Sequence, residues 1–419
     1  MDKKHSEEVA TRRRAILLWI QGKRPCEILR RIGRSQKWFY KWRRRFKEDH
    51  WEGLYDAPRR PHTTSQGYPN STRQLVLQLR RRAQKQKVGL IGARAIRHEI
   101  KQQRLLRKVP ALSSINRWLK AAGLLTTQPE APAEIYYPAP RWPTACVRQA
   151  MDWTSRYLGG AEQVFAFHTL DLTTHGLVQT LTTDKTGASL LRHVLEVWQK
   201  LGLPDFLQLD KEAAFNGGGK TPRRIGVFVR LALFLGIELI FTPPAEPKRN
   251  GVIERVNGLW GESFWDRNHF RSLTDLRRKS HRFIEWYEHR YFPQSLDGKT
   301  VGQACRGQKR IRLTAPQVRT LPEALPITQG RIHFIRRVSA AGEIRLLNET
   351  WKVSKSLAHR YVWATVITYA YRLQIYHRRS QRAAPRLIKS FDYQLPEVRV
   401  PLRPEYRRHT RRCPIWALL

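Results

Sequence analysis

The sequence predicts a multidomain chain with two small helical modules at the front, a central α/β domain and a small all-β barrel near the end. Two proline-rich stretches, residues 57–71 and 128–143, lack helical or strand periodicity, and we interpret them as linkers. Strand-like and helix-like segments alternate from residue 146, whereas strand-like alternation alone fills residues 329–377. The 419 residues also exceed what one ordinary hydrophobic core accommodates.

The composition excludes several classes of protein. Lys and Arg number 78 against 34 Asp and Glu, a formal charge of +44, which favours nucleic acid as the partner. Residues 1–130 hold 32 of the basic and 10 of the acidic residues, half of that net charge. The most apolar stretch, residues 225–241, is interrupted by Arg230 and Glu238, so we expect no membrane span. The opening residues resemble no signal peptide, and the four cysteines lack paired spacing, so we expect a soluble protein of a reducing compartment.

Residues 1–56 predict three helices. The first covers about residues 8–21, the second is PCEILRRI, and the third, QKWFYKWRRRFKED, follows Gly33 and the N-cap residue Ser35. A short helix, a glycine turn and a basic aromatic helix are typical of a helix-turn-helix domain, whose last helix enters the major groove. A helical bundle with a solvated basic face is the alternative. The candidate DNA contacts on the third helix are Gln36, Lys37, Tyr40, Lys41 and Arg44.

Residues 72–127 repeat this pattern with different residues. We expect helices over TRQLVLQLRRRAQKQ, GARAIRHEIKQQ and SSINRWLKAAG, with Ser113 or Ser114 as the cap of the last. Asn116 and Arg117 are the candidate DNA contacts of this second helix-turn-helix domain. Two such modules joined by a linker suit a bipartite site, because tethering raises the effective concentration of the second module.

Residues 144–300 predict three strands, then helix, strand, helix, strand and helix, an α/β layer around a mixed sheet. CVRQAMDWT is expected as a strand ending on Asp152, and a hairpin around His175 follows it. The strand DFLQLD ends on Asp210, and Glu254 lies in the first turn of a helix that follows the turn PPAEPKRNG. Each acid alone could serve its own strand or helix end. In this order, however, they predict one shared site.

Carboxylates that lie close together repel one another, and bound cations relieve that repulsion. Three carboxylates on one edge form a hard oxygen site suited to Mg²⁺, with Mn²⁺ as a substitute. Two such ions can activate the attacking oxygen and stabilise the leaving oxygen of a phosphoryl transfer. We therefore expect Asp152, Asp210 and Glu254 to be both the catalytic and the metal-binding residues, with two ions per site. Asp171 and Glu212 are the substitutes to test if one of the three fails.

The segments MDWT, LDKEAAFNG and PKRNGVIERVNG resemble the three acidic motifs of DDE transposases and retroviral integrases, in the bacterial insertion-sequence branch. The third is the most specific, with Asn250, Gly251, Glu254 and Asn257 in the expected places. The resemblance covers about residues 146–290 and extends to the helix-turn-helix front. It implies an RNase H-like integrase catalytic core in which the three acids bind metal.

Two departures from the family pattern keep an alternative open. Lys211 and Glu212 stand where the family has Asn-Gly, and the 43 residues between Asp210 and Glu254 exceed the usual gap. The glycine-rich residues 216–223 are interpreted as an insertion. The alternative is a catalytically inactive, transposase-derived, sequence-specific DNA-binding regulator.

Other polar residues near the third motif are candidates for phosphate contacts: Lys248, Arg249, Asn250 and Arg255. For the basic residues a solvated basic face is an equally weighted alternative. For His168 and His175 we favour a role in the hairpin over metal ligation or proton transfer.

Residues 329–377 predict a small β-barrel of about five strands, and the family resemblance implies an SH3-like barrel that touches DNA. Residues 378–419 are interpreted as a basic tail, without order in its first part. Taken together, the sequence predicts a transposase or integrase that cleaves DNA 3′ ends and transfers them to target DNA. Its expected partners are the element ends, the target duplex, further copies of itself and an optional helper ATPase. The expected location is the bacterial cytoplasm, at the nucleoid.

Overall fold

The computed structural model describes residues 3–56, 67–86, 89, 92–125, 135–142, 146–159, 162–210, 222–244, 246–407 and 415–418. The chain forms two compact units, Met1–Pro69 and Asn70–Leu419. No helix in the described ranges is long and apolar enough to cross a membrane.

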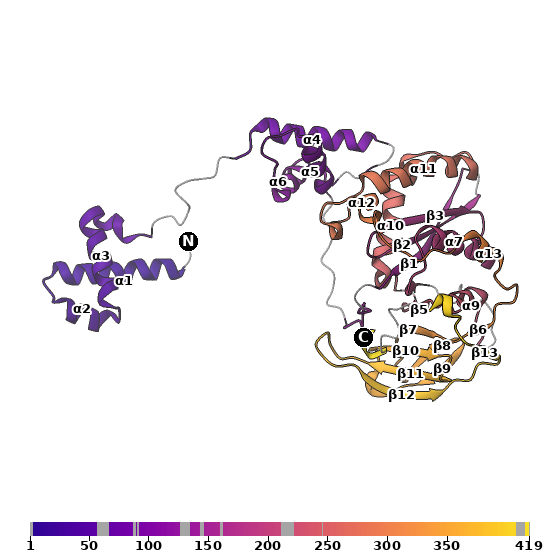
Figure 1. The fold of residues 1–419 in the computed structure, drawn as a ribbon. Coiled ribbons are helices and arrows are strands. Elements are labelled where there is room, and N and C mark those ends of the chain that lie inside the picture. The colour runs from indigo at the N-terminus through magenta and orange to yellow at the C-terminus, as the bar shows by residue number, and fades with distance from the viewer. Residues whose placement is uncertain are drawn as a thin grey trace. The chain divides into compact units, whose positions relative to one another are not determined.

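The first unit contains three helices, α1 (Lys3–Ile20), α2 (Pro25–Ile32) and α3 (Gln36–Asp49), followed by a short 3₁₀ turn (Figure 1). Gly33 ends α2 in the left-handed region at φ 69°, where a Cβ would be strained. Ser35 caps α3 by accepting a hydrogen bond from the backbone N–H of Trp38 at 3.3 Å. Phe39 and Trp42 point into the core of the unit. The predicted helix-turn-helix pattern is thus confirmed.

The second helical set forms α4 (Asn70–Lys85), α5 (Ala93–Gln102) and α6 (Leu112–Ala121). Its own small core comes from one face of each helix, with Val76, Ile96 and Leu119 among the buried residues. The predicted serine cap of α6 is wrong, because the N-cap residue is Ala111 and makes no side-chain cap. Ser114 is instead buried within the helix.

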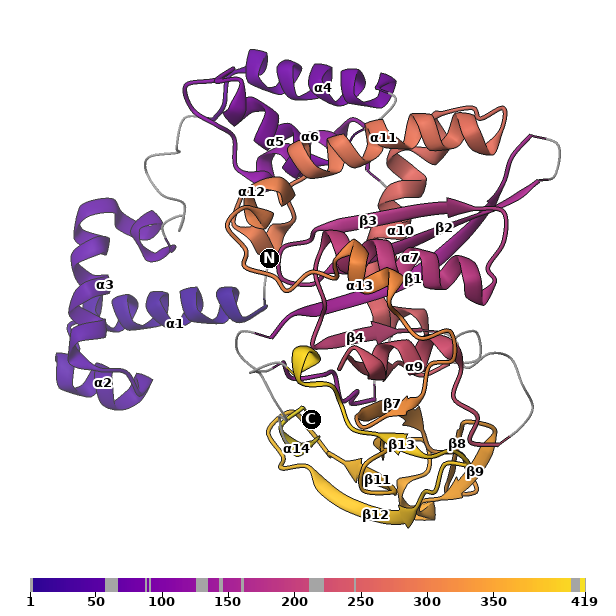
Figure 2. The same ribbon diagram turned by 45° about the vertical axis from the view of Figure 1, so that its right-hand side comes forward.

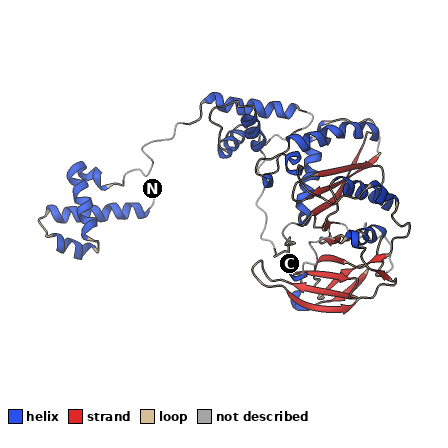
Figure 3. Ribbon diagram, viewed as in Figure 1, coloured by secondary structure: helices blue, strands red, loops and turns tan. Residues whose placement is uncertain are grey.

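A nine-stranded mixed sheet forms the centre of the second unit, in the order β12-β11-β10-β7-β5-β4-β1-β2-β3 (Figures 2 and 3). Strands β2 and β3 run antiparallel to their neighbours, whereas β4 and β5 run parallel to β1. The strands of the predicted α/β domain are β1 (Arg148–Tyr157), β2 (Gln163–Asp171), β3 (Leu177–Thr182), β4 (Phe206–Leu209) and β5 (Glu238–Phe241). The predicted alternation of strands and helices is confirmed.

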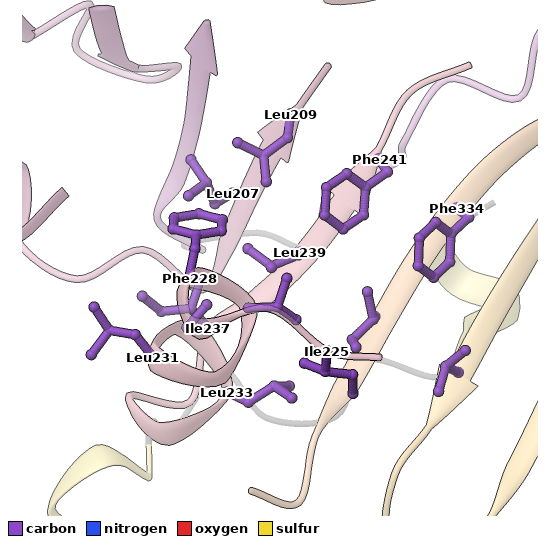
Figure 4. Close-up of a cluster of buried hydrophobic side chains, with 14 of the residues drawn as sticks. Leu207, Leu209, Ile225, Phe228, Leu231, Leu233, Ile237, Leu239, Phe241 and Phe334 are labelled. Atoms are coloured by element: carbon purple, nitrogen blue, oxygen red, sulfur yellow. The ribbon is translucent and has the colours of Figure 1, made fainter. Parts of the chain in front are cut away.

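Helices cover both faces of this sheet because its strands carry apolar residues at successive positions. Met151, Phe167 and Leu207 pack with α7 (Gly187–Lys200) and α9 (Val227–Phe234) on one face. Figure 4 shows part of this cluster, where α9 lies against β4 and β5. Ala150 and Ala166, one position along, pack with α10 (Gly251–Ser263) and α11 (Leu273–Arg290) on the other face. We call these the α7 face and the α10 face.

All five strands expected near the end of the chain are present. They are β7 (Arg331–Arg337), β8 (Glu343–Leu346), β9 (Glu349–Lys352), β10 (Tyr361–Ile367) and β11 (Arg372–His377). The predicted barrel is supported only in part, however, because several of these strands belong to the larger mixed sheet. β7 pairs in parallel with β5, so β7, β10 and β11 continue the central sheet, while β8 and β9 make a two-stranded ladder. The sequence prediction missed this join because pairing partners far apart in the chain leave no local pattern.

The basic tail is more ordered than expected. Residues 386–392 form β12, which pairs with β11 and ends the sheet. Further on, β13 (Arg399–Val400) pairs with β6 (Ile327–Thr328), and α14 covers Ile415–Leu418. Two short helices of the described residues are α12 (Val301–Cys305) and α13 (Ala315–Arg319).

Candidate active site

Asp152 and Asp210 occupy equivalent positions on two adjacent parallel strands. β1 and β4 pair in register up to Met151 and Leu209, and each aspartate is the next residue along. Met151 and Leu209 both point to the α7 face. Because side chains alternate along extended backbone, Asp152 points to the α10 face, and Asp210 follows the end of the neighbouring strand.

β1 does not end at Asp152, as the sequence suggested, but continues to Tyr157. Asp152 is therefore a buried strand residue, 9% exposed, whereas Asp210 does follow the last residue of its strand. The extension arises because β1 pairs with β2 along its whole length, Gln149 opposite Asp171 through Tyr157 opposite Gln163.

Glu254 lies in the first turn of α10, as expected, and is half-buried. Asn257, one turn further along the same helix, donates a hydrogen bond from Nδ2 to Oδ2 of Asp152 at 2.8 Å. Residues three apart share a helix face. This contact therefore directs the Glu254 face of α10 toward β1.

Asn250 fixes the start of α10 to the same two strands. Its side chain is 2% exposed, accepts a hydrogen bond from Nε2 of Gln208 at 3.0 Å and donates one to the carbonyl of Met151 at 3.4 Å. Gln208 also donates to the carbonyl of Arg249 at 3.1 Å. Asn250, grouped with the DNA contacts on sequence grounds, is thus an interior residue that ties α10 to β1 and β4.

The donor set suits a hard divalent cation, since carboxylate oxygens on rigid elements are the ligands that Mg²⁺ prefers. Within the described residues, no group of three or more His, Cys, Asp or Glu side chains lies close enough to bind a metal ion as it stands. Asp152 and Asp210 lie at equivalent positions along neighbouring strands, and Glu254 lies on the helix that is bonded to Asp152 through Asn257.

A buried arginine lies close to Asp210. Arg336 of β7 is 4% exposed and donates from Nη1 to the carbonyls of Thr242 and Ile335, at 3.1 and 2.9 Å. Burial lowers its pKa to about 10, and Tyr137 and, to a smaller extent, the negative charge of Asp210 oppose that shift. Arg336 is therefore charged at neutral pH. The sequence alone does not reveal this residue, because Arg336 and Arg337 are adjacent and of the same type, yet only Arg337 is exposed.

Three basic residues were expected to contact phosphate, and the structure separates them. Lys248 and Arg255 are exposed. Arg249 is 14% exposed, pairs with Glu246 at 3.1 Å and lies over the ring of Tyr137 at 4.4 Å. Its guanidinium is thus already engaged by a carboxylate and an aromatic ring.

The candidate DNA contacts of the helical modules are all exposed. On α3 these are Gln36, Lys37, Tyr40, Lys41 and Arg44; on α6 they are Asn116 and Arg117. The α3 residues lie on the side opposite the buried Phe39 and Trp42.

Of the two substitute acids, Asp171 is remote from this site. It lies opposite Gln149 at the far end of β1, accepts hydrogen bonds from two backbone N–H groups and pairs with Arg310 at 3.3 Å. Glu212 lies outside the described residues. His175 occupies the β2–β3 turn, as expected for a hairpin role, with φ 59°. His168 lies directly opposite Asp152 on β2 and is fully buried.

Two family models match the chain. Residues 6–54 match the homeodomain-like domain, and residues 235–300, which include Glu254, match the integrase core domain. Among solved structures, the chain is similar to the HTLV-2 integrase catalytic core domain in complex with magnesium: 15% identity and a TM-score of 0.29, over 38% of this chain and 95% of that one.

Two further solved structures are similar at the same low level. The simian T-cell lymphotropic virus intasome in complex with PP2A regulatory subunit B56 gamma has 16% identity and a TM-score of 0.33, covering 69% of this chain and 93% of that one. The catalytic core domain of BIV integrase has 12% identity and a TM-score of 0.27, over 37% and 90%. The strand order β3-β2-β1-β4-β5, rather than these scores, identifies the RNase H-like core. The chain thus carries a homeodomain-like domain ahead of an integrase core domain, a combination consistent with a transposase of the DDE superfamily.

Proposed function

We propose that this protein is a DDE-type polynucleotidyl transferase that cleaves DNA at 3′ ends and joins them to target DNA. Asp152, Asp210 and Glu254 act as the catalytic carboxylates and bind two Mg²⁺ ions, or Mn²⁺ in their place. The observation that supports this most strongly is the hydrogen bond from Asn257 to Asp152. This bond joins α10, which carries Glu254, to β1, which carries Asp152. The strand next to β1 is β4, and Asp210 directly follows β4.

The bound cations would supply positive charge beside the scissile phosphate and a lowered pKa for attacking water. The chain's own residues do the remaining work. Asn257 holds Oδ2 of Asp152, and Asn250 fixes the start of α10, so the carboxylates keep their relative positions. The exposed Lys248 and Arg255 contact the backbone of the bound DNA.

Recognition of the element ends falls to the exposed face of α3 and, in the second module, to Asn116 and Arg117. The high positive charge of residues 1–130 makes this binding strongly salt-dependent, because phosphate contacts release counterions. We further propose that two or more copies of the chain assemble on paired DNA ends, with an optional helper ATPase. We also propose that the protein acts in the bacterial cytoplasm, where this DNA is accessible.

The test separates binding from chemistry. The full chain is first used to select duplexes from a random DNA library, and the selected duplex then serves as the donor in a strand-transfer assay. Asp152→Asn, Asp210→Asn and Glu254→Gln keep side-chain shape and remove charge, so they should bind the duplex normally and yield no joined product with Mg²⁺ or Mn²⁺. Asp171→Asn is the matched control and should retain transfer.

Two results would redirect the proposal. Full activity of Asp210→Asn would make Glu212 the candidate second acid. An unaltered chain that binds its selected duplex yet never cleaves, with either metal or with a supplied partner protein, would favour the inactive DNA-binding regulator. Lys211 and Glu212, in place of the family's Asn-Gly, are the observation that keeps this second function in view.

Arg255→Ala distinguishes two roles for that residue. If Arg255 contacts substrate phosphate, the variant should weaken DNA binding at the core and leave metal affinity unchanged. A parallel loss of metal affinity would show instead that Arg255 organises the carboxylates.

A further inference from the structure

Three of the central strands place a row of polar side chains next to Asp152. Asp152 of β1 lies directly opposite His168 of β2, and His168 lies directly opposite Gln179 of β3. All three belong to the α10 face by strand alternation, because Ala150, Ala166 and Leu181 pack there. A polar row through an apolar face carries a desolvation cost that a purely structural face would avoid.

Hydrogen bonds connect this row to both helices above it. Nδ1 of His168 lies 2.6 Å from Oδ1 of Asn257, and Nε2 of His168 lies 2.7 Å from Nε2 of Gln179. At the outer end, Oγ of Ser280 on α11 donates to Oε1 of Gln179. Asn257 completes the path at Asp152.

The chemistry of the last group determines the direction of every bond. An ionised carboxylate only accepts, so Asn257 must present its NH₂ to Asp152 and its carbonyl oxygen to His168. His168 must then donate from Nδ1, and as a neutral ring it must accept at Nε2 from the NH₂ of Gln179. That leaves the carbonyl oxygen of Gln179 for the hydroxyl of Ser280. All four donors point toward Asp152.

The neutral state of the ring is consistent with its surroundings. Complete burial lowers the pKa of His168 to about 4, although the contacts with Asn257 and Asp152 act in the opposite direction. Donors aligned head to tail polarise one another, which strengthens the final bond to the carboxylate.

We propose that Ser280, Gln179, His168 and Asn257 form a relay that holds Oδ2 of Asp152 and so orients this carboxylate for a cation, with His168 as its positioning residue. This inference rests on the proposed function, since it gives Asp152 a cation to bind. Outer hydrogen-bond partners of metal ligands set ligand orientation, and their loss lowers metal affinity about 10-fold or more.

The chain offers a matched control in His193 of α7. It is also fully buried, also bonded at both ring nitrogens, to Thr169 at 2.8 Å and to Thr180 at 2.7 Å, and lies on the opposite face of the sheet. Its ring nitrogens bond to threonines of β2 and β3 and not to Asn257. A change at His193 therefore reports the general cost of altering a buried histidine in this core.

The first experiment measures the relay without any metal. In the full chain labelled with ¹⁵N-histidine, the ring of His168, assigned by its loss in His168→Gln, should show the neutral tautomer protonated at Nδ1 at pH 7. The side chain of Asp152→Asn can donate as well as accept, so it no longer fixes the direction of the hydrogen bonds. The ring of His168 should then be a mixture of its two neutral tautomers. A ring protonated at Nε2 in the unaltered chain, or one unaffected by Asp152→Asn, would overturn the relay.

The second experiment measures Mn²⁺ affinity of the full chain by the electron paramagnetic resonance signal of free Mn²⁺. His168→Leu should weaken binding about 10-fold. His168→Gln keeps one donor and one acceptor and should restore most of it, and His193→Leu should lower the unfolding temperature but leave affinity within twofold. Equal losses in His168→Leu and His193→Leu, or no rescue by glutamine, would refute the positioning role.

The two proposals fail in different ways. If Asp152→Asn leaves Mn²⁺ affinity unchanged, the metal site of the proposed function is wrong, whereas the tautomer of His168 still decides whether the relay exists. If Asp152→Asn abolishes Mn²⁺ binding and His168→Leu does not weaken it, the metal site stands and the positioning role is wrong.

Discussion

Asp152 and Asp210 are adjacent on parallel strands, yet the charge around them differs. Asp152 receives a hydrogen bond from a neutral amide backed by a neutral histidine. Asp210 lies within the field of Arg336, a buried cation. A neutral donor orients a carboxylate and leaves its full charge for a metal ion, whereas a buried cation also competes with that ion. A neutral donor thus orients Asp152, whereas a buried positive charge lies near Asp210.

The largest expected effect is on the Asp210 side. Arg336→Met removes a buried cation and leaves the carbonyls of Thr242 and Ile335 without its donor, so the free energy of unfolding should fall by about 3 kcal/mol. Chemical denaturation of the full chain measures this. Arg337→Met, on the same strand but exposed, should change stability by less than about 0.5 kcal/mol. Equal effects would remove the distinction between the two arginines.

The next effect belongs to the histidine side and depends on pH. Burial depresses the pKa of His168 to about 4 and that of His193 to about 3, against 6.5 for an exposed ring. The stability that these two neutral histidines contribute is complete above pH 6.5. It is lost as the pH falls, because the unfolded chain then binds protons that the folded chain excludes. Between pH 6.5 and its depressed pKa, each histidine should lower the free energy of unfolding by up to about 1.4 kcal/mol per pH unit.

Denaturation at pH 7, 6 and 5 tests this slope. His168→Gln and His193→Gln should each reduce the slope of unfolding free energy against pH by the contribution of one histidine. Arg336→Met should leave this slope unchanged, because an arginine does not titrate between pH 5 and 7. A slope that persists in the double glutamine variant would assign it to other groups.

Removing the neighbour of each aspartate should change the affinity for Mn²⁺ in opposite directions. Asn257→Ala removes the donor to Asp152 and should weaken Mn²⁺ binding about 10-fold. Arg336→Met removes the competing cation and should strengthen it in the molecules that remain folded. Val252→Ala, an exposed position on the same helix as Asn257, is the control and should change nothing. Weaker binding in both variants would mean that Arg336 also serves orientation.

The smallest effect concerns DNA. Lys248→Ala should reduce the slope of binding against salt by about one phosphate contact. Arg249→Ala should leave that slope nearly unaltered, because its guanidinium is engaged by Glu246 and Tyr137. Titration of a fixed duplex at several salt concentrations compares them. A slope change at Arg249 as large as that at Lys248 would show that DNA displaces Glu246.

Local signals predicted much of the fold and of the site. Gly33 and Ser35 determine the ends of α2 and α3 because a left-handed residue and a side-chain cap act within one turn. The order of the acids along the chain, at strand and helix ends, led us to expect one shared site, and the structure places Asp152 and Asp210 at equivalent positions along neighbouring strands. Arg336 and the link from His168 to Asn257 could not be predicted, since both depend on side chains brought together from distant segments. The β5–β7 pairing was missed for the same reason.

That pairing also has a consequence during synthesis of the chain. β5 is complete at Phe241, but its partner β7 leaves the ribosome only after α10 and α11 have been made. For that interval β5 presents an open strand edge, and open edges pair with whatever extended backbone is near. A chain halted before Arg331 should therefore aggregate through β5, so the yield of protein from cells depends on how fast ribosomes traverse this stretch.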